Sequence, residues 1–441
     1  MTYIYSKNDM KIMESGIDSI IEKARIQELN IMEPTLKEYY EVNKIIIEYI
    51  KKKNLIIYGN YCIDLLIKNK NKDDGYYSKN KLEQPLINIY STDPNNEIKQ
   101  ICNIIYEHKY KYIESTFEIN SGLSKIYINL LPYIIISYIP ENIYNLIPII
   151  NINGIKCLHQ HILYINSLYI YNTLLINSDI LKEYFELTNL LIKYYDLDFK
   201  ETKIIRYDLD NNIINFIIKN ILPNNKFILC GYYAYYFYLS KCLSKIDKFI
   251  PYIDILSINY NKDVENINIK LLKHDPSITY KVFNPFLDYF GERTSFYKND
   301  KVILNIYNQN DICIPYIKND NNIICSYQYF IYSSLIKSFI SKCDKNKKEL
   351  NNFNYMVKNL IDKKNIYLDE HKKTILDDTI FKEFDVNCIG DTIKSSRKSR
   401  LYIMKKRKEY KPSLLRNNPE NPIIYDKKVL ILNKINGLIK S

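Results

Sequence analysis

The sequence predicts an α+β protein in which one structural unit occurs twice, between a helical N-terminal lead and a basic C-terminal segment. Three observations lead to this prediction. Short segments recur in the same order in both halves of the chain, apolar residues before residue 54 recur at near-helical spacing, and positive charge is concentrated near the C-terminus. The 441 residues are enough for two or three domains, each with its own core.

The composition is that of a folded protein. Hydrophobic residues make up 46% of the chain and charged residues 25%, which excludes wholesale disorder. Ile, Asn, Lys and Tyr dominate, a bias that A/T-rich codons produce. The longest uncharged apolar run, residues 130–139, is too short to cross a bilayer, and residues 1–9 lack the apolar core of a signal peptide. We therefore expect no membrane partner.

Nine cysteines without a Cys-x-x-Cys pair predict neither a disulfide framework nor a zinc site. A soluble protein of a reducing compartment is the resulting expectation. Cys157 and Cys325 match each other at a predicted helix start. Packing explains this pair better than nucleophilic chemistry does.

The lead, residues 1–53, is predicted to be helical. Residues 35–38, Thr-Leu-Lys-Glu, form a capping box, in which the hydroxyl and the carboxylate satisfy exposed amides of the first turn. The three lysines at 51–53 suit the carboxyl end of that helix. Residues 54–58 then read as a buried strand that stops at Gly59.

A helix from Cys62 to about Lys68 is predicted next, and the polar, lysine-rich residues 69–84 are expected to form an exposed loop. The following strand, residues 85–91, is Pro-Leu-Ile-Asn-Ile-Tyr-Ser, and a helical pattern begins near Asn96.

An internal repeat defines the two units. Five blocks recur in one order, at offsets of 166 to 176 residues: 55–62 with 227–234, 85–91 with 251–257, the helix near Asn96 with that near Asp263, 125–129 with 301–305, and Cys157, Gln160 and Tyr164 with Cys325, Gln328 and Tyr332. Chance could give one such match but hardly five. The domains predicted are 1–53 as helical lead, 54–200 and 201–345 as the two units, and 346–441 as a helical and basic C-terminal region.

The excess positive charge lies mostly within residues 394–416. This segment contains ten basic residues and one acidic residue, Glu409, so its net charge is +9, compared with +12 for the whole chain. The ten are Lys394, Arg397, Lys398, Arg400, Lys405, Lys406, Arg407, Lys408, Lys411 and Arg416. With Tyr402 and Tyr410 interleaved, phosphate neutralisation and base stacking predict an RNA contact. The alternative is a solvated basic helix or a localisation signal.

Each unit places a glycine, Gly59 or Gly231, at a strand-to-helix turn, where the backbone can approach a phosphate. The strand that follows reads Pro-x-x-(Asn/Asp)-x-x-Ser in both units. This arrangement resembles the nucleotidyltransferase fold of the DNA polymerase beta type. It is most similar to the catalytic subunit of poly(A) polymerases of large cytoplasmic DNA viruses, through residues 33–38, 57–60, 85–91, 125–132, 139–140 and 153–156.

The resemblance implies transfer of AMP from ATP to an RNA 3′ hydroxyl, with two metal ions held by aspartates. In this sequence the three metal positions fall on Leu86, Asn88 and Asn129, while Gly59 and Asn60 occupy the nucleotide-binding turn. The second unit, which resembles the degenerate second half of that family, has Tyr252, Asp254 and Asn305 at the equivalent positions. Neither unit assembles a cluster of carboxylates.

Two Mg²⁺ ions need anionic oxygens, both to bind and to neutralise a triphosphate. Because phosphoryl-type transfer depends on positioning and electrostatic stabilisation, we expect no catalysis that matters without those ligands. The acidic residues nearby do not place two carboxylates on one strand face; they are Asp73, Asp74, Glu83, Glu114 and Glu118. We expect no cofactor if the protein is degenerate, and ATP with Mg²⁺ or Mn²⁺ if it is active.

Other candidate residues have plainer interpretations. His159 and His161 are expected at a helix start, where a third metal ligand is lacking. Asp254 could be a surviving ligand, but a solvated or capping residue is the expectation. The tyrosine-rich residues 232–238 are predicted to form a buried helix, with base stacking as the alternative.

Three functions remain open at this stage. The favoured one is a catalytically degenerate member of the viral poly(A) polymerase family that binds RNA in mRNA 3′-end formation and pairs with itself or with an active subunit. The second is an active adenylyltransferase with altered metal ligands, and the third is a scaffold that binds no RNA. The family resemblance places the protein in the host cytoplasm, in viral factories, or in the virion.

Overall fold

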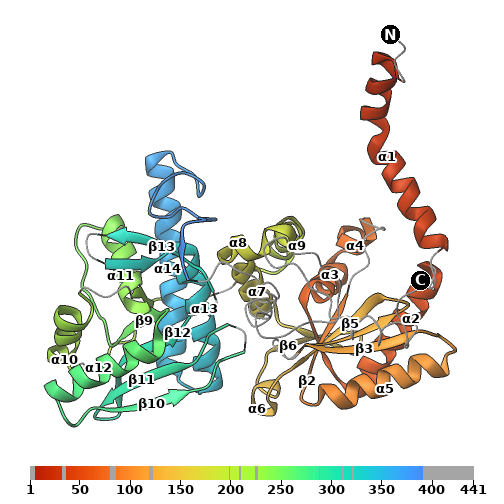
Figure 1. Ribbon diagram of the computed structural model, residues 1–441. Helices are drawn as coiled ribbons and strands as arrows, with labels where there is room; N and C mark the ends of the chain where they lie inside the picture. Colours follow the sequence, from red (N-terminus) through yellow and green to blue (C-terminus); the bar gives the residue numbers. More distant parts are fainter. Residues whose placement is uncertain are drawn as a thin grey trace, which may run out of the picture. The chain divides into compact units, whose positions relative to one another are not determined.

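The computed structural model describes residues 5–31, 36–79, 86–118, 123–197, 199–207, 210–223, 227–287, 289–309, 312–319 and 322–390. One compact unit spans Met1–Asp391. It contains both predicted repeats, each built around its own β-sheet (Figure 1). The domain boundaries expected at 53/54, 200/201 and 345/346 all fall inside this unit and stay predictions.

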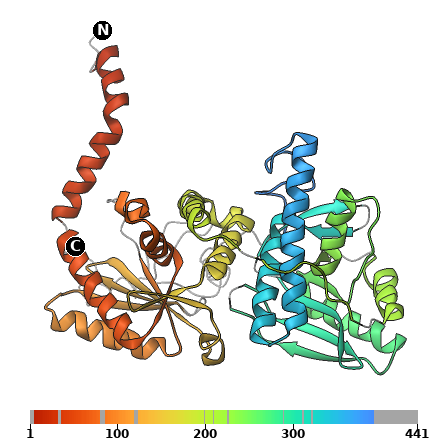
Figure 2. The same ribbon diagram turned by 180° about the vertical axis from the view of Figure 1, so that it is seen from behind.

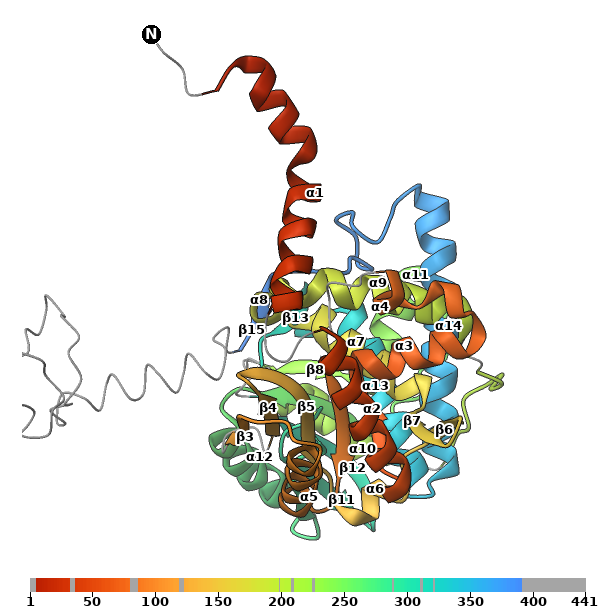
Figure 3. The same ribbon diagram turned by 90° about the vertical axis from the view of Figure 1, so that its right-hand side faces the viewer.

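The helical lead consists of two helices, α1 (Lys7–Ile31) and α2 (Leu36–Lys53), as the spacing of apolar residues predicts. Figure 3 follows α1 as one unbroken helix. In α2, Val42, Ile46 and Ile50 recur at helical spacing and are fully buried. Thr35 of the predicted capping box lies outside the described residues.

The first sheet has seven strands in the order β3-β4-β5-β2-β1-β7-β6. The strands are β1 (Ile56–Tyr58), β2 (Ile87–Ser91), β3 (Ile113–Glu118), β4 (Leu123–Ile128), β5 (Leu131–Tyr138), β6 (Ile149–Ile152) and β7 (Ile155–Leu158). β2 is antiparallel to β1 and parallel to β5. Central strands that are covered on both faces are rich in isoleucine, which accounts for the apolar runs of the sequence.

Helices cover this sheet on both sides. In Figures 1 and 2, α3 (Gly59–Lys70) and α5 (Pro94–Glu107) lie on opposite sides of it. α5 begins where the carboxylate of Asp93 accepts the backbone N–H of Asn96, and Pro94 fits the first turn because its missing N–H is not needed there. The other helices are α6 (Glu141–Tyr144), α7 (Gln160–Asn172), α8 (Leu174–Asn177) and α9 (Leu181–Tyr194).

The stretch expected to be an exposed loop, residues 69–84, is partly helical instead. It contains the 3₁₀-helix Lys72–Asp74 and α4 (Tyr76–Lys79). Tyr76 is buried, and the Tyr77 hydroxyl donates to Glu183 of α9 at 2.8 Å. The polar composition of this segment did not indicate these contacts, because two tyrosines are enough to hold a lysine-rich segment against the rest of the protein.

The second sheet has eight strands in the order β10-β11-β12-β9-β8-β14-β13-β15. They are β8 (Ile228–Cys230), β9 (Ile253–Ser257), β10 (Thr279–Phe283), β11 (Arg293–Lys298), β12 (Lys301–Asn308), β13 (Ile314–Asn319), β14 (Asn322–Cys325) and β15 (Cys388–Ile389). β9 is antiparallel to β8 and parallel to β12, as β2 is to β1 and β5. Apart from β15, the strand order is that of the first sheet.

The helices of the second unit also follow the first. They are α10 (Asn211–Phe216), which continues as the π-helix Ile217–Ile221, then α11 (Gly231–Cys242), α12 (Tyr260–His274), α13 (Tyr327–Cys343) and α14 (Lys347–His371). α14, which lies in the region predicted as 346–441, packs on α11 and α13 (Figure 2). The two-unit α+β fold predicted from the repeat is thus what the structure shows.

The strand order corrects one block of the repeat. Residues 125–129 are the end of β4 and a turn, whereas residues 301–305 belong to β12, whose counterpart is β5. Asn129 lies in the β4–β5 turn with a positive φ of 49°. The counterpart of Asn305 is therefore not Asn129 but Ile135, since Asn305 pairs with Asp254 and Ile135 with Asn88.

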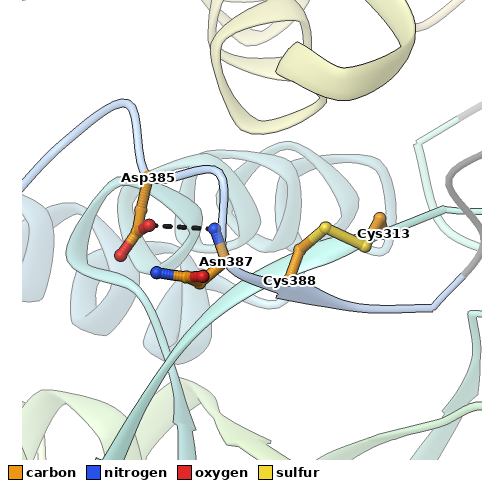
Figure 4. The surroundings of a disulfide bond; sticks show 4 residues. All are labelled: Cys313, Asp385, Asn387 and Cys388. Atoms are coloured by element: carbon orange, nitrogen blue, oxygen red, sulfur yellow. Dashed lines mark hydrogen bonds between the residues drawn. A yellow bond between two sulfur atoms is a disulfide. The ribbon is translucent and has the colours of Figure 1, made fainter.

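A disulfide joins Cys313 to Cys388, with their Cα atoms 5.3 Å apart (Figure 4). It ties the short strand β15 to β13, and the side chain of Asp385 accepts the backbone N–H of Asn387 in the turn before it. The sequence predicted no disulfide framework and did not indicate this single bond. Because 75 residues separate the partners, no local spacing could have indicated the bond.

Among the described residues, no helix is both long and apolar enough to cross a membrane.

Candidate functional site

The candidate site of the first unit is built on the turn from β1 to α3. Gly59 opens α3 with a φ of +73°, in the left-handed region that favours glycine. Tyr58 of β1 pairs with Asn88 of β2, which brings the Asn88 side chain against the turn. A Cβ atom on Gly59 would collide with the Asn88 amide. The structure therefore brings together Gly59 and Asn88, two of the residues singled out in the sequence.

Of the three expected metal positions of the first unit, only Asn88 lies in a row of side chains that crosses the sheet. Asn88 of β2 lies beside Ile135 of β5, and Ile135 lies beside Lys125 of β4. All three side chains are only partly buried, whereas Ile134 and Ile136 are fully buried on the other face. Leu86 precedes β2, and Asn129 is not in the row. The row thus consists of an amide, an aliphatic side chain and an ammonium group.

This row does not fit a magnesium ion. Mg²⁺ takes oxygen ligands and, in nucleotide sites, relies on one or more carboxylates. Asn88 offers a neutral oxygen, Ile135 offers none, and Lys125 is a cation two strands away. Within the described ranges, no group of three or more His, Cys, Asp or Glu side chains could hold a metal.

The nearby acidic residues are engaged elsewhere or lie at a distance. Asp74 accepts from Lys193 and Tyr194, both of α9. Glu114 is exposed on β3, which β4 and β5 separate from β2. Asp73 lies in the 3₁₀-helix beside Asp74, and Glu83 is outside the described residues. Glu114 and Glu118 are four residues apart in β3 and so lie on one face of that strand, which contradicts the expectation that no two of these acids share a strand face.

Asn60 is held by a carboxylate that the sequence did not single out. Its Nδ2 donates to Glu183 Oε1 of α9 at 2.9 Å. The same oxygen accepts the Tyr77 hydroxyl, and burial together with Glu183 raises the pKa of Tyr77. The Oδ1 atoms of Asn60 and Asn88 are both buried without a hydrogen-bond partner. Two unsatisfied amide oxygens near the turn could accept hydrogen bonds from a bound ligand.

The same turn in the second unit surrounds a carboxylate. Gly231 opens α11 with a φ of +59°, and a Cβ there would collide with Asp254 of β9. Asp254 is fully buried, so its expected role as a solvated or capping residue is wrong. Asn305 Nδ2 donates to Asp254 Oδ1 at 2.9 Å, and Lys337 of α13 forms an ion pair with Asp254 Oδ2. Lys337 was missed because 83 residues separate it from Asp254 in the chain.

A cleft of about 1020 Å³ adjoins this network in the second unit. Arg293, Asn305, Lys337 and Glu349 are among its lining residues. Glu349 of α14 accepts the hydroxyls of Tyr207 at 2.8 Å and Tyr252 at 2.7 Å. Burial raises the pKa of Glu349, and these two hydrogen bonds oppose the increase. Tyr252, the counterpart of Leu86, therefore donates a hydrogen bond to Glu349.

The plainer interpretations of the remaining candidates hold. His159 caps α7 and His161 lies in its first turn, as expected of a helix start. Cys157 and Cys325 are fully buried. The tyrosine-rich residues 232–238 lie in α11, with Tyr232, Tyr235, Tyr236 and Tyr238 buried. Helix capping by His159 and packing of the buried side chains thus account for these residues.

The basic residues predicted to bind RNA, Lys394 to Arg416, lie outside the described residues, so this expectation stays a prediction.

The two sheets share the same strand order, and in each a glycine turn packs against the adjacent strand. These features define a protein of two nucleotidyltransferase-like units. Two family models match the chain. The model of the poly(A) polymerase catalytic subunit matches residues 44–176. The model described as APMV, putative poly(A) polymerase, catalytic subunit, C-terminal, matches residues 156–437. The chain belongs to the poly(A) polymerase catalytic subunit family of large DNA viruses.

Individual relatives agree with this assignment. The putative poly(A) polymerase catalytic subunit of Acanthamoeba polyphaga mimivirus is 27% identical over 95% of this chain and 78% of its own length. That of African swine fever virus (strain Badajoz 1971 Vero-adapted) is 26% identical over 26% of this chain and 24% of its own. The crystal structure of the Megavirus polyadenylate synthase superposes with a TM-score of 0.83 at 26% identity, covering 93% of this chain and 85% of that one.

Proposed function

We propose that this family member serves the formation of mRNA poly(A) ends as a non-catalytic, RNA-binding protein. The observation that carries the proposal is the row Asn88, Ile135 and Lys125, which holds no carboxylate where adenylyl transfer needs metal ligands. The transfer depends on electrostatic stabilisation of the triphosphate, and an amide, an aliphatic side chain and an ammonium supply no anionic ligand for a metal. The glycine turn remains, so the fold is kept while the chemistry is lost.

RNA is the proposed ligand for two reasons. The relatives are named poly(A) polymerase catalytic subunits and a polyadenylate synthase, whose product is a polynucleotide. In addition, residues 394–416 carry most of the excess positive charge, with two tyrosines among the bases. A second copy of this chain or an active subunit is the proposed partner, in viral factories of the host cytoplasm or in the virion.

A primer-extension assay tests the loss of catalysis. The full chain is incubated with ATP, an oligo(A) primer and Mg²⁺ or Mn²⁺, and we expect no extension even at high protein concentration. If the wild-type chain shows activity, Asn88→Gln tests whether that activity depends on Asn88, because the variant keeps an amide but moves it. Extension by the wild-type chain that Asn88→Gln abolishes would establish the alternative, an active adenylyltransferase with altered ligands.

RNA binding is tested by its salt dependence. We expect the affinity for single-stranded RNA to fall steeply with salt, and the slope of log K against log [salt] to lose up to about 5 units when seven bases are neutralised. The seven are Arg397, Lys398, Arg400, Lys405, Lys406, Arg407 and Lys408. Neutralising Lys51, Lys52 and Lys53, which are exposed on α2, is the control and should change the slope little. No binding, or binding insensitive to salt, would instead indicate a scaffold.

A further inference from the structure

The carboxylate of Asp254 has a protein partner at each of its oxygens. Asn305 Nδ2 donates to Oδ1, and the Asn305 Oδ1 atom in turn accepts the Ser295 hydroxyl at 2.6 Å. The ammonium of Lys337 forms an ion pair with Oδ2. The Asp254 side chain is fully buried and that of Lys337 is 6% exposed. A buried carboxylate is tolerated only when it is paired in this way.

Asp254 occupies the position that a metal-binding strand would use. It lies on β9 against the Gly231 turn, as Asn88 lies on β2 against the Gly59 turn. In both sheets the next side chain of the row comes from the parallel strand, Asn305 of β12 in one and Ile135 of β5 in the other. The residues of the second unit nevertheless do not fit a divalent metal, because a lysine is already at the carboxylate.

The residues of both units fail to fit a pair of metal ions, but for different chemical reasons. In the second, the carboxylate is present and a cation of the protein neutralises it. In the first, the carboxylate is replaced by the neutral amide of Asn88, and no cation is needed. The position twelve residues after Cys325 is Lys337, whereas the position twelve after the matching Cys157 is Tyr169. The lysine is therefore found in the unit that keeps the aspartate.

The surroundings of Lys337 keep it charged. Burial acts to lower the pKa of its ammonium, but Asp254, Tyr307 and Cys230 together outweigh burial, so the pKa lies above the ordinary value. The ammonium also lies 5.1 Å from the ring centroid of Tyr307 and 5.5 Å from that of Phe353. Aromatic faces favour a desolvated cation. A metal ion could reach Asp254 only by displacing this caged ammonium.

We propose that the Lys337 ammonium is the resident cation of the second unit, standing at Asp254 where a divalent metal would bind in a nucleotidyltransferase site. The second unit then needs no metal and accepts none. This inference goes beyond the proposed function, which concerns the first unit and the basic segment, and it holds or fails independently of RNA binding.

Thermal unfolding of the full chain tests the proposal, with Mn²⁺, ethylammonium and EDTA as additives. We expect the Tm of the wild type to be the same in EDTA and in millimolar Mn²⁺. Lys337→Ala should lose about 10 °C in Tm, because a buried carboxylate is left uncompensated. Either Mn²⁺ or ethylammonium, entering the space of the lost side chain, should restore part of that loss. Lys270→Ala, an exposed lysine of α12, is the control and should respond to neither.

A double variant keeps the test decisive if Lys337→Ala does not fold. Asp254→Asn with Lys337→Met removes both charges, and we expect it to fold and to ignore Mn²⁺ and ethylammonium. If neither variant folds, Lys337 serves packing rather than charge, and the proposal is overturned. It is also overturned if Lys337→Ala folds and responds to neither cation, or if Mn²⁺ stabilises the wild type but not Asp254→Asn.

Discussion

The side-chain amide of Asn88 lies directly against Gly59, on the side where any other residue would carry its Cβ atom. The contact joins the turn before α3 to the adjacent strand β2. Gly59 is thus required twice, once for its positive φ and once for the space that Asn88 takes. Gly231 and Asp254 repeat the relationship in the second unit.

Gly59→Ala is expected to lower the free energy of unfolding by about 2–4 kcal/mol, since a left-handed alanine costs about 1–2 kcal/mol and the collision with Asn88 adds to it. Urea unfolding measures the change. Gly154→Ala is the matched control: Gly154 has a φ of +82° but nothing within 4 Å of an added Cβ, so its cost should be about 1 kcal/mol. Equal losses in the two variants would show that Asn88 does not restrict the turn.

Much of the fold could be predicted because the repeated units contain matching apolar segments. Ile56 and Ile57 of β1 and their counterparts Ile228 and Leu229 of β8 are buried because both strands lie in the middle of a sheet. Hydrophobic runs of this kind and the glycine that ends each one are local signals. They located both turns and the strand residues that lie against them.

The alignment of Asn129 with Asn305 failed for a physical reason as well. β4 and β5 form a hairpin of two apolar strands, and a sequence match cannot tell which of them is parallel to β2. Only the sheet register decides, and it places Ile135 beside Asn88. Lys337 and Glu183 were missed because each reaches its partner, Asp254 or Asn60, from a helix distant in sequence. Pairings of that kind leave no spacing to recognise.

The disulfide is expected to stabilise the attachment of β15. Closing a loop of 75 residues is worth about 4 kcal/mol in the chain-entropy account, so Cys313→Ser should lower the free energy of unfolding by roughly that amount. Urea unfolding with and without dithiothreitol checks this, and the reductant should affect only chains that carry both cysteines. Cys242→Ser, at a free cysteine of α11, is the control. Nine titratable thiols in the unfolded, unreduced wild type would contradict the bond.

His159 should make the stability depend on pH. Burial, with His161 and Lys342 adding to it, lowers the pKa of His159 to about 4. The folded chain therefore binds fewer protons than the unfolded chain, whose histidines titrate near 6.5, and the free energy of unfolding should fall as pH drops from about 6.5 to about 4. His159→Asn keeps a capping side chain and should flatten this part of the profile relative to the wild type. His108→Asn, at an exposed histidine, should leave the profile as it is; an equal effect of both would refute the assignment.

Glu349 accepts hydrogen bonds from the hydroxyls of three tyrosines. Tyr207 and Tyr252 donate to it at 2.8 and 2.7 Å, and Tyr232 donates at 3.3 Å. Glu349→Gln replaces one accepting oxygen by a donor, and we expect it to cost about 1–3 kcal/mol of unfolding free energy. Glu349→Leu should cost more, because all three hydroxyls lose their acceptor. Tyr252→Phe should cost about 1 kcal/mol alone but little when added to Glu349→Leu, since the bond it removes is already gone. Additive losses in the double variant would mean that the carboxylate and the phenol act independently.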